Sequence, residues 1–418
     1  MDSGENRPQS AAVDPALTAA ALALDAGDVL GALKRVALRS DAPGLALRGV
    51  ALARLGKRER ARELLRAAAK AFGSSAPLGR ARCLLADAEV ALASRELRGV
   101  GEALASASRE LRALGDTVNA LHADCLAARA LLLRGRLADA ERALRALQLS
   151  HAPAALSAEI HLAWAELHLR TPDTRAARAA LGQATRAANR AKISAISREV
   201  SAASALLEAP AARLIQSGAE RVLCLAQVEA LLGSSGLLID ARELVLRAGP
   251  ARVSLLRRPV LFSLARALGE AWPGEVPRRV LLQQVFSVAR PNDSHRARLR
   301  VEVARLRRAL RSLASIAATP AGFQLTPGAG SQVCVLAPLL EGEHATLLAL
   351  LGDGEAWSSS ALAVALGVSQ RSVQRGLLAL ENAVKVRATG RARAKRWHLL
   401  PGAEFATPLL LPGALELA

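Results

Sequence analysis

The sequence predicts a mainly α fold in which a long array of paired helices is followed by two smaller modules with short β-hairpins. Ala, Leu and Arg dominate the 418 residues, whereas aromatic residues make up only 2% and Tyr is absent. This composition favours helices and argues against a sandwich of β-sheets. From about Val13 to Gly233 apolar residues recur at helical spacing between short turns, and from Leu237 onward short apolar runs indicate strands.

The charge of the chain points to a polyanionic partner. Of 56 basic residues all but six are Arg, and against 37 acidic residues they leave a net charge of +19. Residues 237–327 are the most basic part, with 16 basic and 6 acidic groups. A protein this basic is drawn to nucleic acid. The first residues are polar and acidic, unlike a secretory signal, so we expect a cytoplasmic, nucleoid-associated protein that does not bind membranes.

Small residues mark turns between paired helices in the first part of the chain. Gly49, Gly56, Ala61 and Ala68 follow one another at steps of seven, five and seven, which fits two antiparallel helices that approach closely at a turn. Weaker copies contain Ala20, Gly27 and Ala32, then Ala128, Gly135 and Ala140, and further turns are expected near Arg95 and Thr171. This spacing resembles the tetratricopeptide repeat.

The resemblance implies a solenoid of helical hairpins over residues 13–236, preceded by a disordered N-terminus at residues 1–12. Its concave surface would bind a protein or peptide partner. The alternative is an irregular helical bundle, because Ala-rich helices produce such spacings by chance.

A different order of elements is predicted for residues 237–327. Short strands at 237–239, 244–246 and 252–254 form a meander, helices follow at 259–271, 277–286 and 294–313, and a hairpin at 316–325 ends the segment.

The third helix of this segment is unusually rich in arginine. Its apolar stripe is Leu299, Val303, Leu306, Leu310 and Leu313. The rest of its circumference carries Arg296, Arg298, Arg300, Arg305, Arg307, Arg308 and Arg311. Guanidinium groups suit both phosphate and the edge of guanine. The alternative is a solvated basic face with ion pairs, for which Glu302 is the one acid inside the predicted helix.

Residues 237–325 resemble the OmpR/PhoB-type winged-helix domain of bacterial response regulators. The resemblance rests on the meander, on Val280, Leu281 and Leu282, on the run 301–310 and on the hairpin segment 319–325. It implies that the third helix enters the major groove. The residues that would face DNA are Arg296, Arg298, Arg300 and Arg305, with Thr319 at the start of the wing. Ala321 stands where the family often carries Arg, and no receiver domain precedes the module, so control by aspartyl phosphate is not implied.

Residues 340–401 predict a second helix-turn-helix. Ala363, Gly367 and Val373, at steps of four and six, fit a helix crossing, a turn and an inward anchor. Ser369 would cap the second helix, which presents Gln370, Arg371, Gln374 and Arg375 outward. A basic hairpin follows, with Arg391, Arg393, Lys395 and Arg396, and it resembles the wing of bacterial winged-helix repressors. The alternative is a protein-binding winged helix. Residues 328–339 are expected to be a linker and 402–418 a C-terminal tail.

Together these features predict a DNA-binding transcriptional regulator that grips duplex DNA through tandem winged helices and uses the helical repeats to bind a partner or signal. Homodimer formation stays open. No catalytic, cofactor-binding or metal-binding residues are predicted: Gly56 and Lys57 precede Arg58 rather than Ser or Thr, so there is no Walker loop, and no HExxH motif occurs. The alternative is a protein-interaction scaffold that contacts nucleic acid only nonspecifically.

Overall fold

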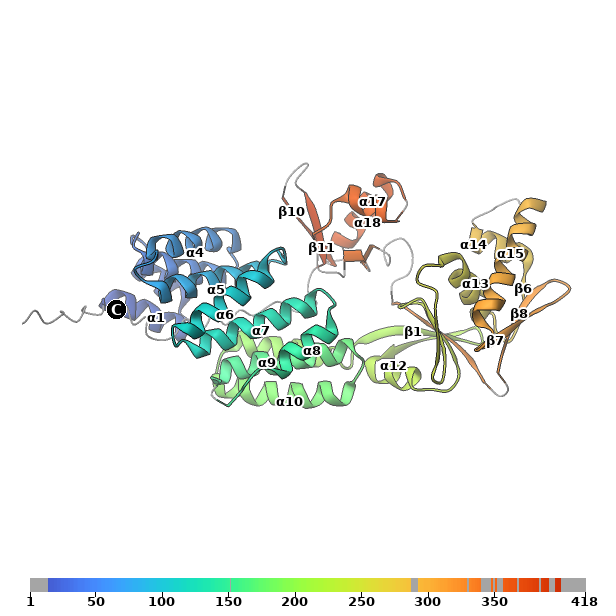
Figure 1. Ribbon diagram of the computed structural model, residues 1–418, viewed down its shortest axis with the longest axis horizontal. Coiled ribbons are helices and arrows are strands. Elements are labelled where there is room, and N and C mark those ends of the chain that lie inside the picture. Colours follow the sequence, from blue (N-terminus) through green and yellow to red (C-terminus); the bar gives the residue numbers. More distant parts are fainter. Residues whose placement is uncertain are drawn as a thin grey trace, which may run out of the picture. The chain divides into compact units, whose positions relative to one another are not determined.

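The structure is a computed structural model of a mainly helical chain with a few small sheets (Figure 1). It describes residues 14–150, 152–286, 292–328, 331–339, 347–348, 350–351, 356–366, 368–382, 385–390 and 395–399. The predicted disordered N-terminus and C-terminal tail lie outside these residues. One compact unit comprises Met1–Thr171, Arg175–Ser204 and Thr346–Ala418, and the other comprises Pro172–Thr174 and Ala205–Ala345. Within the described part of the chain, no helix combines the length and apolar character needed to cross a membrane.

The first part of the chain is an array of antiparallel helices. They are α1 (Pro15–Asp25), α2 (Val29–Val36), α3 (Ala42–Arg54), α4 (Arg58–Phe72), α5 (Pro77–Ala93), α6 (Val100–Ala113), α7 (Thr117–Leu133), α8 (Leu137–Arg145), α9 (Ala154–Arg170), α10 (Thr174–Ala191) and α11 (Ser194–Ala205). From α1 to α9 each helix packs against the next. The odd-numbered helices α1, α3, α5, α7 and α9 also contact one another in sequence, which makes the array layered.

Glycines close the turns of this array, as the sequence predicts. Gly27, Gly56 and Gly135 have φ values of 82°, 75° and 70°, a conformation that favours glycine, and they separate α1 from α2, α3 from α4 and α7 from α8. At Gly49 a Cβ atom would lie 2.8 Å from Cγ of Leu65, so the close approach of α3 and α4 requires a glycine. The two remaining predicted turns occur at Arg95 and Thr171. The predicted helix pairs are therefore confirmed.

The expectation that residues 13–236 are entirely helical is wrong at their C-terminal end. Strands β1 (Pro210–Gln216) and β2 (Ala219–Cys224) form a hairpin, and α12 (Leu225–Leu232) follows it. Ser217 and Gly218 have φ values of 49° and 77°, and two consecutive positive φ values make the tight turn that suits a two-residue hairpin loop. The sequence does not predict this turn, because the strands beside it are only partly apolar.

The hairpin belongs to a six-stranded sheet with the order β2-β1-β9-β3-β4-β5. The predicted meander is confirmed as β3 (Leu237–Asp240), β4 (Val245–Ala248) and β5 (Ala251–Ser254). The predicted linker is wrong, because it contains β9 (Val333–Ala337), which pairs parallel with β3 and antiparallel with β1. Both faces of β9 are buried: Val335 joins the core below α13 and Leu336 joins the cluster around α12. A strand buried on both faces has no polar alternation to reveal it.

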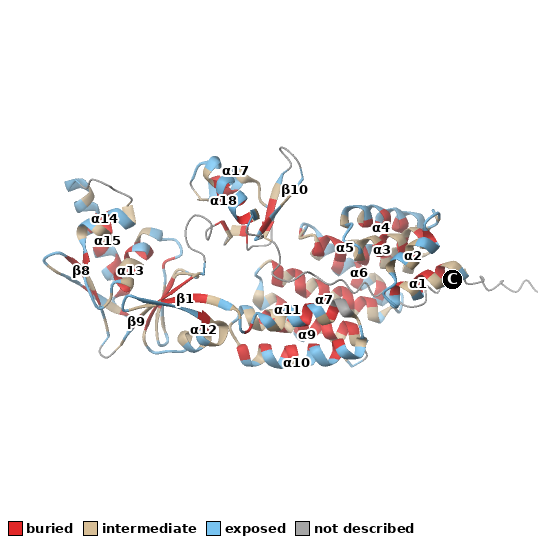
Figure 2. Cartoon of the chain, turned by 180° about the vertical axis from the view of Figure 1, so that it is seen from behind, coloured by how far each residue is buried: buried red, intermediate tan, exposed pale blue. Residues whose placement is uncertain are grey.

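Three helices and a small sheet complete this module. They are α13 (Pro259–Glu270), α14 (Arg278–Phe286), α15 (Asp293–Leu310), β6 (Val276–Pro277), β7 (Ala314–Ala318) and β8 (Gly322–Pro327). The small sheet has the order β6-β8-β7. The predicted stripe of α15 faces inward, with Leu299, Val303, Leu306 and Leu310 buried against α13 and both sheets (Figure 2). The predicted order of strands, three helices and a hairpin is confirmed.

A second small module follows in the other unit. Its described elements are α17 (Ser359–Leu366), α18 (Gln370–Asn382), β10 (Val386–Thr389) and β11 (Arg396–Leu399). Val373, Leu377 and Leu380 of α18 are buried as predicted, and they pack with Leu362 and Trp397. The two strands pair antiparallel, and the strand at Trp397 also forms a bridge to Trp357.

Candidate nucleic-acid interface

Helix α15 begins at a well-formed cap. The side chain of Asn292 accepts a hydrogen bond from the backbone N–H of His295 at 3.0 Å, and Nδ1 of His295 accepts one from the N–H of Asn292 at 3.3 Å. The negative charge of Asp293 in the first turn interacts favourably with the positive end of the helix dipole. The cap fixes where the helix starts, and with it the direction in which each arginine projects.

The arginines of α15 are exposed, and they divide between two flanks. Successive residues are rotated by about 100° around a helix, so Arg296 and Arg298 point to nearly opposite sides and cannot share one face. The four arginines expected to face DNA are therefore split, with Arg296 and Arg300 on one flank and Arg298 and Arg305 on the other. Between the flanks runs a strip of small exposed side chains, Ala297, Val301 and Ala304.

One flank faces the small sheet, and we call it the β7 flank. It comprises Arg296, Arg300, Arg307 and Arg311, spaced four, seven and four residues apart. Arg307 donates from Nε to the carbonyl oxygen of Ile316 in β7 at 2.8 Å. Arg296 pairs with Asp293 at 3.3 Å, an exposed contact that contributes little stability. Among the described residues, Arg300 and Arg311 have no carboxylate partner.

The opposite flank faces the other two helices, and we call it the α13 flank. It comprises Arg298 and Arg305, seven residues apart, whereas Arg308, four residues after Ala304, lies in line with the strip. The guanidinium carbon of Arg298 lies 4.8 Å from the centre of the Phe286 ring of α14. Arg305 pairs with Glu302 at 2.8 Å. Both acids of the helix are thus used in single ion pairs, and the helix keeps a large excess of positive charge.

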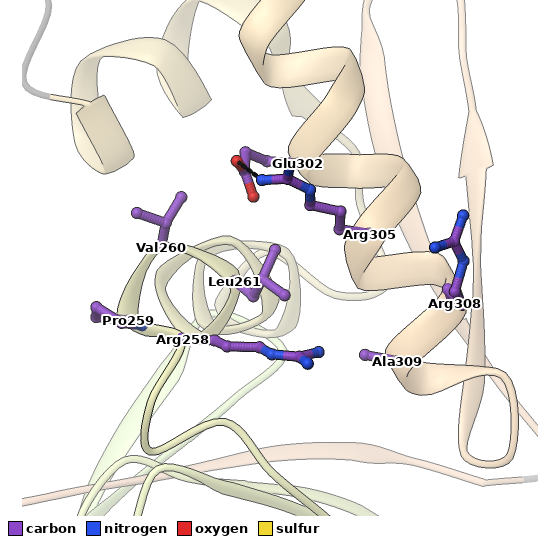
Figure 3. Close-up of a pocket in the computed structure, with 8 residues that line it drawn as sticks. All are labelled: Arg258, Pro259, Val260, Leu261, Glu302, Arg305, Arg308 and Ala309. Carbon is purple, nitrogen blue, oxygen red and sulfur yellow. Dashed lines mark hydrogen bonds and ion pairs between the residues drawn. The ribbon is translucent and has the colours of Figure 1, made fainter.

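A pocket of about 620 Å³ lies beside this flank, between α15 and the first turn of α13 (Figure 3). It is lined by Arg258, Pro259, Val260, Leu261, Glu302, Arg305, Arg308 and Ala309. In Figure 3, Arg258 and Arg305 extend into the space between the helices from opposite sides. The sequence did not single out Arg258. Its only sequence signal is its place before Pro259 at a helix start, and its position opposite α15 depends on tertiary packing.

Thr319 has a structural role in the turn between β7 and β8. Its hydroxyl oxygen accepts a hydrogen bond from the N–H of Gly322 at 2.8 Å, and its carbonyl oxygen accepts one from Arg278 at 2.9 Å. Arg278 also donates to the carbonyl oxygen of Pro320 at 2.8 Å and lies over the ring of Phe323. The turn is therefore fixed by its own contacts, and Thr319 positions it.

Helix α18 presents a single outward face. Ser369 caps the helix, because its hydroxyl oxygen accepts a hydrogen bond from the backbone N–H of Ser372 at 3.2 Å. The outward residues are Arg371, Gln374, Arg375 and Leu378, spaced three, one and three residues apart, and all four are exposed. Gln370 is exposed too, but it lies toward α17 and donates from its amide to the hydroxyl of Ser359 at 3.0 Å.

The following hairpin supplies two more of the predicted residues. The Lys395 ammonium lies 4.4 Å from the centre of the Trp397 ring, a cation–π distance. Arg396 is half-buried and donates to the carbonyl oxygen of Lys395 at 3.1 Å. Arg391 and Arg393 lie outside the described residues. With α18, this hairpin forms a second basic surface.

No family model, curated protein or solved structure matches this chain.

A second polar site lies inside the helical array. We call Glu89, His122, Arg129, Glu159 and Glu199 the buried polar cluster. Nε2 of His122 lies 3.8 Å from Oε1 of Glu89 and 3.5 Å from Oε2 of Glu159, both longer than an ordinary hydrogen bond. Arg129 pairs with Glu199. Within the described residues, the carboxylate oxygens of Glu89 and Glu159 have no hydrogen-bond partner.

Burial decides which members of this cluster carry protons. It raises the pKa of Glu89 well above its usual value, to which nearby Glu159 adds, and it raises the pKa of Glu159 as well. Burial also lowers the pKa of His122 to about 4, with Arg129 acting in the same direction. The carboxyls therefore hold protons more readily than usual, while the imidazole stays neutral. The sequence signal for this cluster is the presence of polar residues on apolar helix faces.

Proposed function

We propose that this protein is a DNA-binding transcriptional regulator in which two winged helices contact duplex DNA and a tetratricopeptide-like helical array binds a protein or peptide partner. The observation that carries the proposal is the charge distribution of α15: seven arginines from Arg296 to Arg311 surround an inward apolar stripe, with only Asp293 and Glu302 as acids in the helix. Such a regulator has no catalytic chemistry and would act at the nucleoid in the cytoplasm.

The geometry of α15 supports insertion into the major groove. A helix fits this groove, and the strip of Ala297, Val301 and Ala304 lets it approach the base edges closely. Small apolar side chains also suit the methyl group of thymine. The β7 flank and the α13 flank then lie on either side of the strip, where the two phosphate backbones border the groove.

The outward face of α18 supports direct base recognition. Arg pairs with two acceptors of guanine, and Gln pairs with the acceptor and donor of adenine. Arg371, Gln374 and Arg375 are exposed together on this face, and the described residues contain no carboxylate that pairs with either arginine. We propose that α18 selects sequence and that the hairpin with Lys395 contacts the backbone beside it.

The test is the salt dependence of binding to duplex DNA. Full-length protein is titrated into a fluorescent duplex of mixed sequence between about 50 and 200 mM salt. Each neutralised phosphate adds about −0.9 to the slope of log K against log salt, and we expect a slope of about −3 or steeper. A flat dependence, or no binding at the lowest salt concentration, overturns the proposal. DNA fragments selected by the protein then define its operator.

A second candidate function is a protein-interaction scaffold. It is favoured by exposed apolar side chains on the second module: Val364 is 84% exposed, Leu378 51% and Val368 42%. Such residues are unusual beside a purely ionic surface and suit a protein partner. If Leu378→Ser abolishes capture of a partner protein while DNA binding is absent throughout, the scaffold is the correct function.

A further inference from the structure

We infer that the pocket between α13 and α15 binds one phosphate of the DNA backbone. This inference rests on the proposed function and names the part of the DNA that the pocket would recognise. The pocket is built from two helices of one module, and three arginines, Arg258, Arg305 and Arg308, contribute to its lining. A single acid, Glu302, lines it, and that acid already pairs with Arg305.

The charges of the pocket call for an anion. Within the described part of the chain, neither Arg258 nor Arg308 has a carboxylate partner, and both are exposed at the pocket. Arg258 extends from the α13 side and Arg305 from the α15 side (Figure 3). Glu302 balances the charge of Arg305, so Arg258 and Arg308 leave the pocket with a net positive charge. This charge favours an anion, and the planar guanidinium fork matches the oxygens of a phosphate.

The backbone of α13 adds further donors. The N–H groups of the first turn of a helix have no acceptor within the helix, and they carry the positive end of its dipole. Val260 and Leu261 belong to this turn and line the pocket. Pro259, the first residue of the helix, has no backbone N–H and therefore leaves no donor unsatisfied. The pocket thus lies beside the N-terminus of a helix as well as between guanidinium groups, and both favour a phosphate.

The position of the pocket indicates a phosphate of DNA rather than a free one. Arg305 belongs to the α13 flank and also lines the pocket, so the pocket continues this flank toward the C-terminal end of α15. A DNA strand that follows Arg298 and Arg305 along the groove would reach it next. Arg258 and Arg308 are exposed at the pocket, so a backbone group of a large ligand could reach them.

The experiment uses the full-length chain with Arg258→Gln, Arg258→Lys and the control Arg257→Gln. Arg257 is the adjacent exposed arginine, and it does not line the pocket. Binding is measured to duplexes that each carry one neutral methylphosphonate. We expect one backbone position at which the neutral group weakens binding of the unmodified protein about tenfold. Arg258→Gln should weaken binding to the unmodified duplex by a similar factor, and the methylphosphonate at that position should then no longer change the affinity. The slope of log K against log salt should become less steep by about 0.9.

The remaining arms decide the source of the phosphate. Arg257→Gln should keep the sensitive position, and Arg258→Lys should restore part of the affinity, since it keeps the charge but loses the bidentate fork. If no backbone position couples to Arg258, the assignment to DNA is overturned, even if pyrophosphate raises the melting temperature of the unmodified protein alone. If the protein binds no DNA at all, the proposed function fails instead. Stabilisation by pyrophosphate that Arg258→Gln removes would then still support a phosphate pocket, and its absence would overturn it.

Discussion

Gly322 shows how a single residue holds the small sheet together. Strand β8 passes so close to β6 that a Cβ atom on Gly322 would lie 1.8 Å from the carbonyl oxygen of Val276. That oxygen belongs to the backbone, which cannot rotate away as a side chain could. The space between the strands therefore excludes every residue except glycine.

We predict that Gly322→Ala destabilises this module by about 1–3 kcal/mol, the usual cost of overpacking. Gly328→Ala is the matched control, because among the described residues the nearest atom to its added Cβ is Oγ of Ser331 at 4.0 Å. The measurement is urea unfolding of a fragment that spans residues 205–345. The fluorescence of Trp272, the single Trp in that range, reports the unfolding. Equal unfolding midpoints for the two variants would contradict the prediction.

Glu89 links the stability of the helical array to pH. Its pKa is raised on folding, so the folded chain holds the proton more tightly than the unfolded chain. The stability that this proton contributes is complete below the unfolded pKa of about 4.5 and is lost as the pH rises through the folded pKa. His122 acts in the opposite direction: its contribution is lost as the pH falls from 6.5 toward about 4. Above pH 6.5 the glutamates therefore decide the trend.

We predict that Glu89→Gln gains stability relative to the unsubstituted protein as the pH rises above the unfolded pKa of about 4.5, because a neutral amide has no proton to lose. The control is Glu59→Gln, which makes the same chemical change at an exposed position of α4. Thermal unfolding is followed by circular dichroism at each pH. The same pH trend in both variants would show that burial of Glu89 is not responsible.

At the scale of elements, the two basic helices differ in how they distribute their polar residues. The arginines of α15 lie on two flanks, which suits contacts to two backbones, whereas Arg371, Gln374 and Arg375 of α18 share one face. The proposed function therefore assigns the selection of bases mainly to α18. Gln370 provides a control for this assignment. Its amide donates a hydrogen bond to the hydroxyl of Ser359 and lies outside the outward face of α18.

We predict that Gln374→Ala relaxes the base preference of the protein at one position, by about 1–3 kcal/mol of discrimination, while affinity for random DNA changes little. Gln370→Ala removes the same type of side chain from the side of α18 that lies toward α17, and it should leave the base preference unchanged. The readout is the set of DNA fragments that each variant selects. If Gln370→Ala and Gln374→Ala alter the selected sequences alike, the outward face of α18 does not read bases.

Sequence patterns revealed the elements whose signals are local. The turn glycines and small residues such as Gly56 and Ala61 predicted the helix pairs, and the apolar stripe of α15 predicted its buried face. The sequence did not predict strand β9. Its partner β3 lies far earlier in the chain, and a short apolar run that is buried on both faces has no alternation to detect. The candidate residues of α15 were predicted to be exposed, yet the pocket at Arg258 could not be predicted, since it exists only where two helices meet.

At the scale of the whole molecule, the module that contains α15 begins earlier in the chain than the sequence predicts. The predicted start at residue 237 leaves out β1, β2 and α12. Strands β1 and β2 extend the sheet beyond β9, and α12 packs on one face of it, where Ala212, Leu214 and Val228 pack with Leu238 and Leu336. A fragment that starts at residue 237 would expose this face and an edge of β9.

We predict that residues 205–345 fold cooperatively and bind DNA, whereas residues 237–345 are unstable or aggregate, because apolar area and strand edges are left uncovered. Circular dichroism, urea unfolding and DNA titration compare the two fragments. A stable, DNA-binding 237–345 fragment would show that β1, β2 and α12 are dispensable.

The central place of β9 also orders events on the ribosome. Strands β1 and β3 both pair with β9, yet β9 is made after every other strand of that sheet. Until residues 333–337 emerge, the nascent chain carries two partial sheets, each with an open edge that could pair with a neighbouring chain. At about 5–20 residues per second this interval lasts several seconds after β5. The module therefore completes its fold only when translation has passed β9, and a chain that stalls before this strand is exposed to misassembly.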